Sequence, residues 1–209
     1  GKFVCALVTE SQPKRLRLIN QNGRELNLPI SRVVHCSDRT HEAEMSRESL
    51  VNHLKDTTDK RCSLMNKVNL RELWELTTDE SSSVFSPSFL AELTFGEDAN
   101  DDTISAFLRC VFVDKLYFKY KEGKILANSP EKVEQLVIQL EKEAKRNKLI
   151  EEGAAAIAEI QKQGFKQREL TPFQVETLEI IKDYYLFGSD AKEAAVAQKI
   201  LKSASVTTA

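Results

Sequence analysis

The sequence predicts a mainly helical α+β fold, in which a small β unit comes first and helices dominate afterwards. Three observations support this prediction. Short runs of alternating apolar and polar residues fill the first 36 positions, apolar residues at helical spacing begin at Ser46, and three short helical patterns run directly into an alternating stretch that ends at Ala127. These changes of pattern divide the chain into three regions, 1–45, 46–128 and 129–209.

The composition limits the class of protein. The 209 residues are 41% apolar, enough for one or two domains with real cores at roughly 100 to 200 residues per domain. The 30 Lys and Arg nearly cancel the 32 Asp and Glu, which excludes a globally basic nucleic-acid coat but not a local basic patch. No apolar run approaches ~18 residues, so we expect no membrane span and no membrane partner.

The N-terminus and the cysteines indicate the cellular setting. The chain starts at Gly1 and enters a strand-like run without a charged and apolar leader, so we expect a piece of a longer cytoplasmic protein. Its four cysteines are at least 26 residues apart and form no CxxC pair. This spacing favours free thiols, buried or half-buried, over metal ligation or a disulfide framework.

The first region reads as four short strands that form a small curled sheet or half-barrel. Residues 3–8 alternate, residues 14–19 alternate basic and apolar side chains, and Asn22-Gly23 suits a two-residue hairpin that returns through residues 24–28. Pro29 would end that strand, and residues 32–36 would add a last one. A sheet this small is stable only when it packs against other elements, here the helices that follow.

The second region predicts helices from their caps. Ser46 is a candidate N-cap for a helix whose apolar face is Leu50, Val51, Leu54, Thr58, Cys62 and Met65. Asn69 with Glu72 resembles a capping box, Ser86-Pro87 opens a helix that Gly96 stops, and another helix follows the acidic turn 97–102. Strands near 116–121 and 124–127 would flank the turn Glu122-Gly123. Three helices followed by such a hairpin is the order of a winged helix-turn-helix.

The third region is a helical one. Ser129-Pro130 opens a long helix that we expect to reach Gly164, with a kink near Gly153. Thr171-Pro172 caps the next helix, Gly188 ends it, and Ser189 would cap the last one, which runs to Ser203. The apolar stripe of the long helix could serve a dimerising coil, but residues 145–148 break the heptad, which favours packing within the chain.

Acidic and histidine clusters could hold a metal, yet none has a complete pattern. His35-Cys36 lacks the further ligands that zinc needs. The acidic run 97–102 could hold Mg²⁺, but it lies where a helix starts, and carboxylates there interact favourably with free N–H groups. We therefore assign no catalytic residue, no metal ligand and no cofactor within this chain.

Positive charge gathers in two places. Between positions 11 and 24 no acid interrupts the basic residues, and the expected wing carries lysines beside a tyrosine whose ring could stack on an unpaired base. The candidate RNA contacts are Lys14, Arg15, Arg17, Tyr117, Lys119, Lys121 and Lys124. The alternative is an ordinary solvated hairpin with Tyr120 buried, and the near-neutral total charge does not decide between the two.

Several runs together resemble one family. They are Gly23 to Pro29, Arg32 to His35, Glu72 to Leu76, Leu90 to Gly96, Leu116 to Lys119 and Ser129 to Leu136. Their combination resembles the N-terminal region of bacterial ribonuclease II-like exoribonucleases. The similarity is to the subgroup that carries a helix-turn-helix region ahead of the catalytic RNB domain, in place of cold-shock domains.

The resemblance implies that RNA hydrolysis and RNA guidance belong to different parts of the protein. In that family, aspartates of the RNB domain hold Mg²⁺ at the bottom of a channel that admits single strands, and they hydrolyse RNA from its 3′ end. This chain would be the non-catalytic N-terminal part, which guides single-stranded RNA to its own downstream catalytic domain or shields the mouth of the channel. We expect it to bind RNA only weakly by itself. The alternative is a winged-helix module that binds duplex DNA or a protein, although helix 102–114 offers few outward polar residues beyond Ser105 and Arg109.

Overall fold

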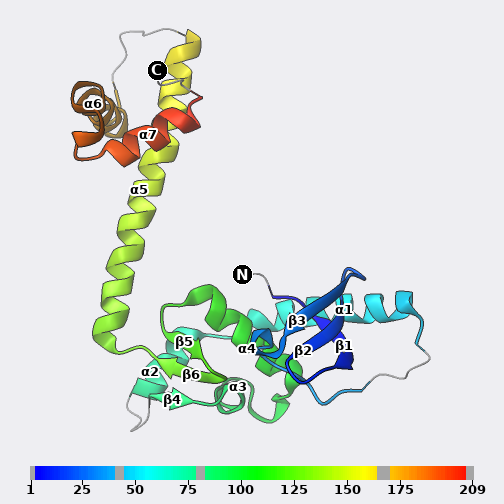
Figure 1. Cartoon of the computed structure of the whole chain (residues 1–209). Coiled ribbons are helices and arrows are strands. Elements are labelled where there is room, and N and C mark those ends of the chain that lie inside the picture. The colour runs from blue at the N-terminus through cyan, green and yellow to red at the C-terminus, as the bar shows by residue number, and fades with distance from the viewer. Residues whose placement is uncertain (1–2, 41–44, 79–82, 164–169, 206–209) are drawn as a thin grey trace. The chain divides into compact units, whose positions relative to one another are not determined.

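The computed structural model describes residues 3–40, 45–78, 83–163 and 170–205 (Figure 1). Its contacts divide the chain into two compact units, Gly1–Val133 and Glu134–Ala209. Seven α-helices and two three-stranded sheets in the described residues confirm a mainly helical α+β fold. None of the described helices is both long and apolar enough to span a membrane.

The first sheet contains strands β1 (Ala6–Ser11), β2 (Arg15–Asn20) and β3 (Glu25–Pro29), which are antiparallel with β2 in the middle. In the register Leu7 faces Ile19 and Leu18 faces Leu26. The sheet packs on helix α1 (Arg47–Met65), where Cys5, Leu50 and Leu54 are buried together. The prediction of a small β unit that leans on the next helix is confirmed.

Two details of this unit differ from the prediction. The β2–β3 turn has three residues rather than two, because Gly23 N–H donates to the Asn20 carbonyl at 2.8 Å and only Gly23 has a positive φ, of 72°. It is a type I turn followed by a glycine bulge. The expected fourth strand at 32–36 is absent from the described sheet. Instead Ile30–Arg32 forms the 3-10 helix η1, and Val34 packs against the core of the following helices.

The rest of the first unit is a winged helix-turn-helix, as predicted. Its elements are α2 (Leu70–Thr78), β4 (Val84–Phe85), α3 (Pro87–Phe95), the 3-10 helix η2 (Gly96–Asp98), α4 (Asp101–Asp114), β5 (Phe118–Lys121) and β6 (Lys124–Ala127). The sheet order is β4-β6-β5, and Glu122 and Gly123 both have positive φ, which allows the tight hairpin turn. Leu90, Phe107, Phe118 and Ile125 are at most 1% exposed and form the centre of the core.

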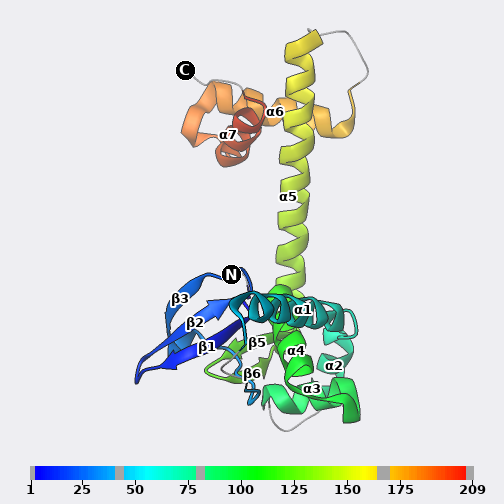
Figure 2. The ribbon, with the colours of Figure 1, turned by 90° about the vertical axis from the view of Figure 1, so that its right-hand side faces the viewer.

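Helix α1 lies across α4, as Figures 1 and 2 both show. The Cys110 thiol of α4 lies 3.7 Å from the Met65 carbonyl of α1. The predicted cap Ser46 is confirmed, because its hydroxyl accepts from Ser49 N–H at 3.2 Å. Cys62 is nevertheless exposed, contrary to its predicted place on the packing face, whereas its neighbour Arg61 is turned inward with only 13% of its side chain exposed.

The cysteine prediction is correct for two residues and wrong for two. Cys5 is buried and Cys110 is half-buried, but Cys36 and Cys62 are exposed. Cys36 is exposed because the expected fourth strand, which would have had one buried face, does not form.

The second unit contains most of α5 (Pro130–Gln163), α6 (Pro172–Phe187), the 3-10 helix η3 (Gly188–Asp190) and α7 (Ala194–Ser203). The predicted N-cap of α6, Thr171, is confirmed, and Gln174 completes a capping box with it. The last helix begins at Ala194 and not after Ser189, because the chain first makes the 3-10 turn of η3.

Helix α5 is continuous through Gly153, where the sequence predicted a kink. Gly153 is instead a contact point, since a Cβ built there would lie 2.9 Å from Thr177 Oγ1 of α6 and 3.3 Å from Ile200 Cδ1 of α7. Farther toward its N-terminus, Leu140 and Ala144, two apolar residues of the stripe that the sequence predicts to pack within the chain, are exposed.

Candidate nucleic-acid interface

The three lysines of the wing share one face of the β5–β6 hairpin. Lys121 stands directly opposite Lys124, while Lys119 stands opposite Leu126. Residues that alternate with them, Phe118 and Ile125, point into the core. Like charges placed directly opposite each other destabilise a sheet, so this pair does not serve the stability of the hairpin. None of the three lysines forms an ion pair within the described part of the chain, although Glu122 lies in the turn between them.

Tyr117 lies at the base of the wing and is half-buried. Its ring centroid is 5.5 Å from that of Trp74 with the planes tilted by 41°, and the Trp74 indole N–H donates to the Asn128 carbonyl at 2.7 Å. The ring is thus held in a fixed place, with one part left for contact. Tyr120 packs against Phe112 and donates its hydroxyl to the Val34 carbonyl at 3.3 Å, so its polar end is occupied.

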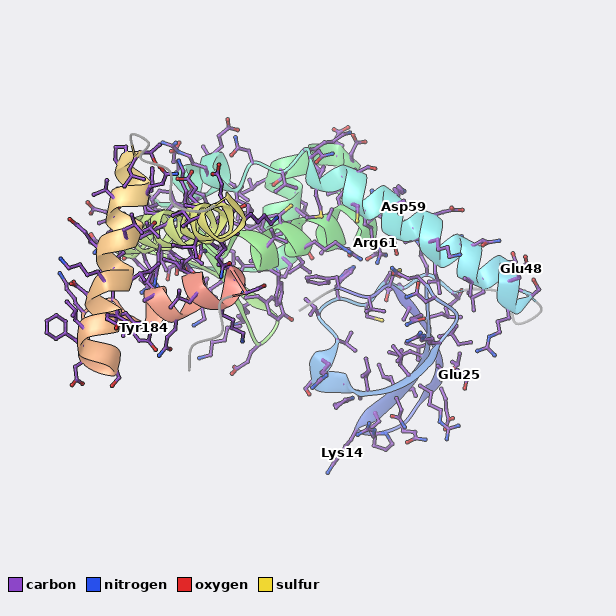
Figure 3. All side chains as sticks on the ribbon, turned by 90° about the horizontal axis from the view of Figure 1, so that it is seen from above. Lys14, Glu25, Glu48, Asp59, Arg61 and Tyr184 are labelled. Carbon is purple, nitrogen blue, oxygen red and sulfur yellow. The ribbon has the colours of Figure 1, made fainter. Side chains whose placement is uncertain are left out.

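The basic residues of the first sheet have more partners than the sequence suggested. Arg15 donates to the side chain and the carbonyl of Asn27 at 2.7 and 2.8 Å. Arg17 pairs with Glu10 on the neighbouring strand at 3.0 Å. Lys14 is exposed in the connection between β1 and β2, and Figure 3 shows it at the tip of the sheet. The acid-free run in the sequence therefore does not make an acid-free surface.

A buried ion cluster joins α1, α4 and the segment that leads into α1. The sequence alone did not predict it. The Asp102 carboxylate is 1% exposed, and its oxygens lie 3.2 Å from Arg39 Nη2, 2.9 Å from Lys60 Nζ and 3.0 Å from Arg61 Nε. Figure 3 shows Arg61 where α1 meets the rest of the unit. The partners lie 41 to 63 positions away in the sequence, so no local pattern could reveal them.

The pKa values of two groups reflect these surroundings. Burial raises the pKa of the Asp102 carboxyl, but hydrogen bonds from Lys60 and Arg61 and the charges of the arginines outweigh it, so the pKa lies below its ordinary value. His35 Nε2 lies 3.3 Å from Asp101 Oδ1. Burial of the imidazole outweighs the attraction of Asp101, so the pKa of His35 is also lowered.

The acidic run at the start of α4 neither caps the helix by carboxylates nor gathers metal ligands. The N-cap is Asn100, whose Oδ1 accepts from the N–H groups of Asp102 and Thr103 at 2.9 and 3.3 Å. Thr103 completes a capping box by accepting from Asn100 N–H. Among the residues that the structure describes, no three His, Cys, Asp or Glu side chains could hold a metal ion together.

In a winged helix-turn-helix that binds duplex DNA, the helix before the wing contacts the bases. The face of α4 that would make these contacts is mostly covered. Ser105 and Arg109, expected to point outward, are only 6% and 7% exposed. The Arg109 guanidinium lies over the Phe3 ring at 5.2 Å, and α1 covers the same side. A duplex groove could reach this face only after the N-terminal segment and α1 had moved away.

One family comparison gives a match. Residues 133–209 match the family model of the double helix-turn-helix domain of ribonuclease II, which corresponds to the second unit of the structure. No curated protein and no solved structure matches the chain. Over these residues the second unit is thus similar to a double helix-turn-helix domain of the ribonuclease II type. The runs that suggested this resemblance lie almost entirely before residue 133, outside the matched part.

Proposed function

We propose that this chain is the non-catalytic N-terminal region of a 3′-5′ exoribonuclease of the ribonuclease II type, and that it guides single-stranded RNA to a catalytic domain. The observation that carries this proposal is the match of residues 133–209 to the double helix-turn-helix domain of ribonuclease II. The RNA hydrolysis itself would belong to a downstream domain that holds Mg²⁺, the hard cation that suits carboxylate ligands.

The wing supplies the phosphate contacts in this proposal. Lys119, Lys121 and Lys124 project from one face without ion-pair partners among the described residues, and Tyr117 stands at the base of the same hairpin. Ammonium groups bind the backbone without regard to base sequence, which suits an enzyme that must accept many RNAs. Because the chain as a whole has a net charge of −2, we expect its affinity for RNA to be weak at physiological salt.

Binding of a single-stranded oligonucleotide, followed by fluorescence anisotropy at several salt concentrations, tests the wing. We expect Lys119→Ala/Lys121→Ala to lower the slope of log K against log salt by about 1.4, since each phosphate contact contributes roughly 0.7 on a single strand. The control Lys55→Ala/Lys67→Ala removes the same charge from exposed sites outside the wing and should leave the slope unchanged. Equal slopes in the wild type, the wing variant and the control would show that the wing is an ordinary solvated hairpin.

Incubation with RNA and Mg²⁺ tests the assignment of catalysis to another domain. We expect the chain to leave a single-stranded substrate intact, because we assign it no catalytic residue. Degradation that disappears in Asp101→Asn/Asp102→Asn, provided that this variant remains folded, would contradict the non-catalytic role.

A further inference from the structure

Helix α7 has two opposite faces of different chemistry. Val196, Ala197, Ile200 and Leu201 are buried, and Ile200 contacts the place where Gly153 brings α5 close. The positions between them, at the spacing i, i+3, i+4, i+7 and i+8 that defines one helix face, are all exposed. They are Ala195, Gln198, Lys199, Lys202 and Ser203. A rigidly seated helix therefore presents a polar face to solvent.

The charge of this face has one sign. The helix contains Lys199 and Lys202 and no acid, and neither lysine forms an ion pair in the described residues. The other two helices of the unit carry both signs: α6 has more acids than bases, and α5 mixes Glu with Lys along its length. Within the second unit, α7 is thus the described helix whose charged side chains are all cationic.

A hydrogen bond holds part of this face in place. Gln198 Nε2 donates to the Tyr184 hydroxyl of α6 at 3.2 Å, and Figure 3 shows Tyr184 on the side of α6 toward α7. This contact fixes the amide while its carbonyl oxygen can still accept. The next residue along α6, Tyr185, is 87% exposed and offers an aromatic surface in the same unit.

We propose that the outer face of α7 is a second contact surface for RNA, with Lys199 and Lys202 bound to phosphates of a single strand. This inference rests on the proposed function and adds a site to it. Phosphate is the ligand that suits two exposed ammonium groups three positions apart on a helix that has no acid of its own. Gln198 contributes a neutral hydrogen bond beside them.

The stability of α7 offers a simpler explanation for the lysines. Cations near the C-terminus of a helix interact favourably with its macrodipole, and Lys202 lies in the last turn of α7. That role would change the melting temperature of the chain but not its affinity for RNA. Both quantities must therefore be measured on the same variants.

The test compares Lys199→Ala/Lys202→Ala with Lys142→Ala/Lys182→Ala, a control that removes the same charge from exposed positions of α5 and α6 next to acids. We expect the α7 variant to bind a single-stranded RNA oligonucleotide on the order of tenfold more weakly at about 0.1 M salt, with a slope lower by about 1.4. The control should bind like wild type. Lys199→Arg/Lys202→Arg should retain binding, because it retains both charges.

The outcomes separate this inference from the function on which it rests. One outcome is that the wild-type chain binds RNA with an affinity that falls in the wing variant but not in the α7 variant. In that case the α7 proposal is wrong and the proposed function stands. If the α7 variant changes only the melting temperature, the macrodipole explains the lysines. If the wild-type chain does not bind single-stranded RNA under any salt condition, both proposals fail.

Discussion

Asp102 places a full negative charge where only 1% of its side chain is exposed, and three cations compensate it. Removing the charge by Asp102→Asn would leave Arg61, itself largely buried, without its carboxylate. Loss of one partner from a buried ion pair costs about 3 to 5 kcal/mol, so we expect the free energy of unfolding to fall by this amount. Urea denaturation followed by Trp74, the single tryptophan of the chain, measures it in the first unit.

The same residue predicts how stability depends on pH. The pKa of Asp102 is lower in the folded state, so its contribution is complete above the unfolded value of about 3.9 and is lost as the pH falls through the folded pKa. We expect wild type to lose more stability than Asp102→Asn as the pH falls below about 4. Asp98→Asn, an exposed carboxyl three residues before the start of α4, is the control and should behave like wild type. Parallel curves for Asp102→Asn and wild type would contradict the ion cluster.

The four thiols should differ in reactivity. Burial raises the pKa of the Cys110 thiol to about 11, helped by the nearby Asp114, and Cys5 is buried. The thiolate is the reactive form, so we expect an alkylating reagent at about pH 8 to modify Cys36 and Cys62 quickly, and Cys5 and Cys110 only after unfolding. Mass spectrometry of peptides after timed alkylation would show this order. Fast modification of Cys110 in the native chain would contradict its position between α4 and α1.

At the scale of the element, Gly153 determines how closely three helices pack in the second unit. Alanine favours a helix by about 1 kcal/mol over glycine, but here its Cβ would lie 2.9 and 3.0 Å from two atoms of Thr177. Overpacking costs about 1 to 3 kcal/mol, so we expect Gly153→Ala to lower the melting temperature. The double variant Gly153→Ala/Thr177→Ala should lose less stability than the sum of the losses in the two single variants. Strict additivity would show that the two side chains do not compete for this space.

Element boundaries were predictable wherever local chemistry sets them. Ser46, Ser86 and Thr171 cap the helices at which the sequence placed them, and the hairpin at Glu122-Gly123 forms where expected. The prediction was wrong where contacts distant in sequence decide. Residues 32–36 do not form a strand because Val34 packs against the winged-helix core instead.

The candidate contacts were predictable to different degrees for the same reason. Strand alternation alone places Lys119 and Lys121 on the outer face of the wing, and the structure agrees. The ion pair of Arg17 with Glu10 depends on the register between two strands, and the burial of Arg109 depends on an N-terminal segment about 100 residues away. A single sequence contains no local pattern for either contact.

At the scale of the whole molecule, the two units pose separate questions. The first contains a winged helix-turn-helix whose third helix, α4, is covered and whose wing is exposed. The second is the part that matches the double helix-turn-helix domain of ribonuclease II. RNA contact in the first unit is therefore expected at the wing rather than along α4, which reverses the usual use of such a fold on duplex DNA.

Photochemical cross-linking to a single-stranded RNA that carries 4-thiouridine tests this claim most directly. The cross-linked peptides, identified by mass spectrometry in the full chain, should include the wing residues Tyr117–Lys124. Peptides from α4 should be absent, because α1 and the N-terminal segment cover that helix. Cross-links on α4, or bound RNA that leaves the wing unlabelled, would contradict the account.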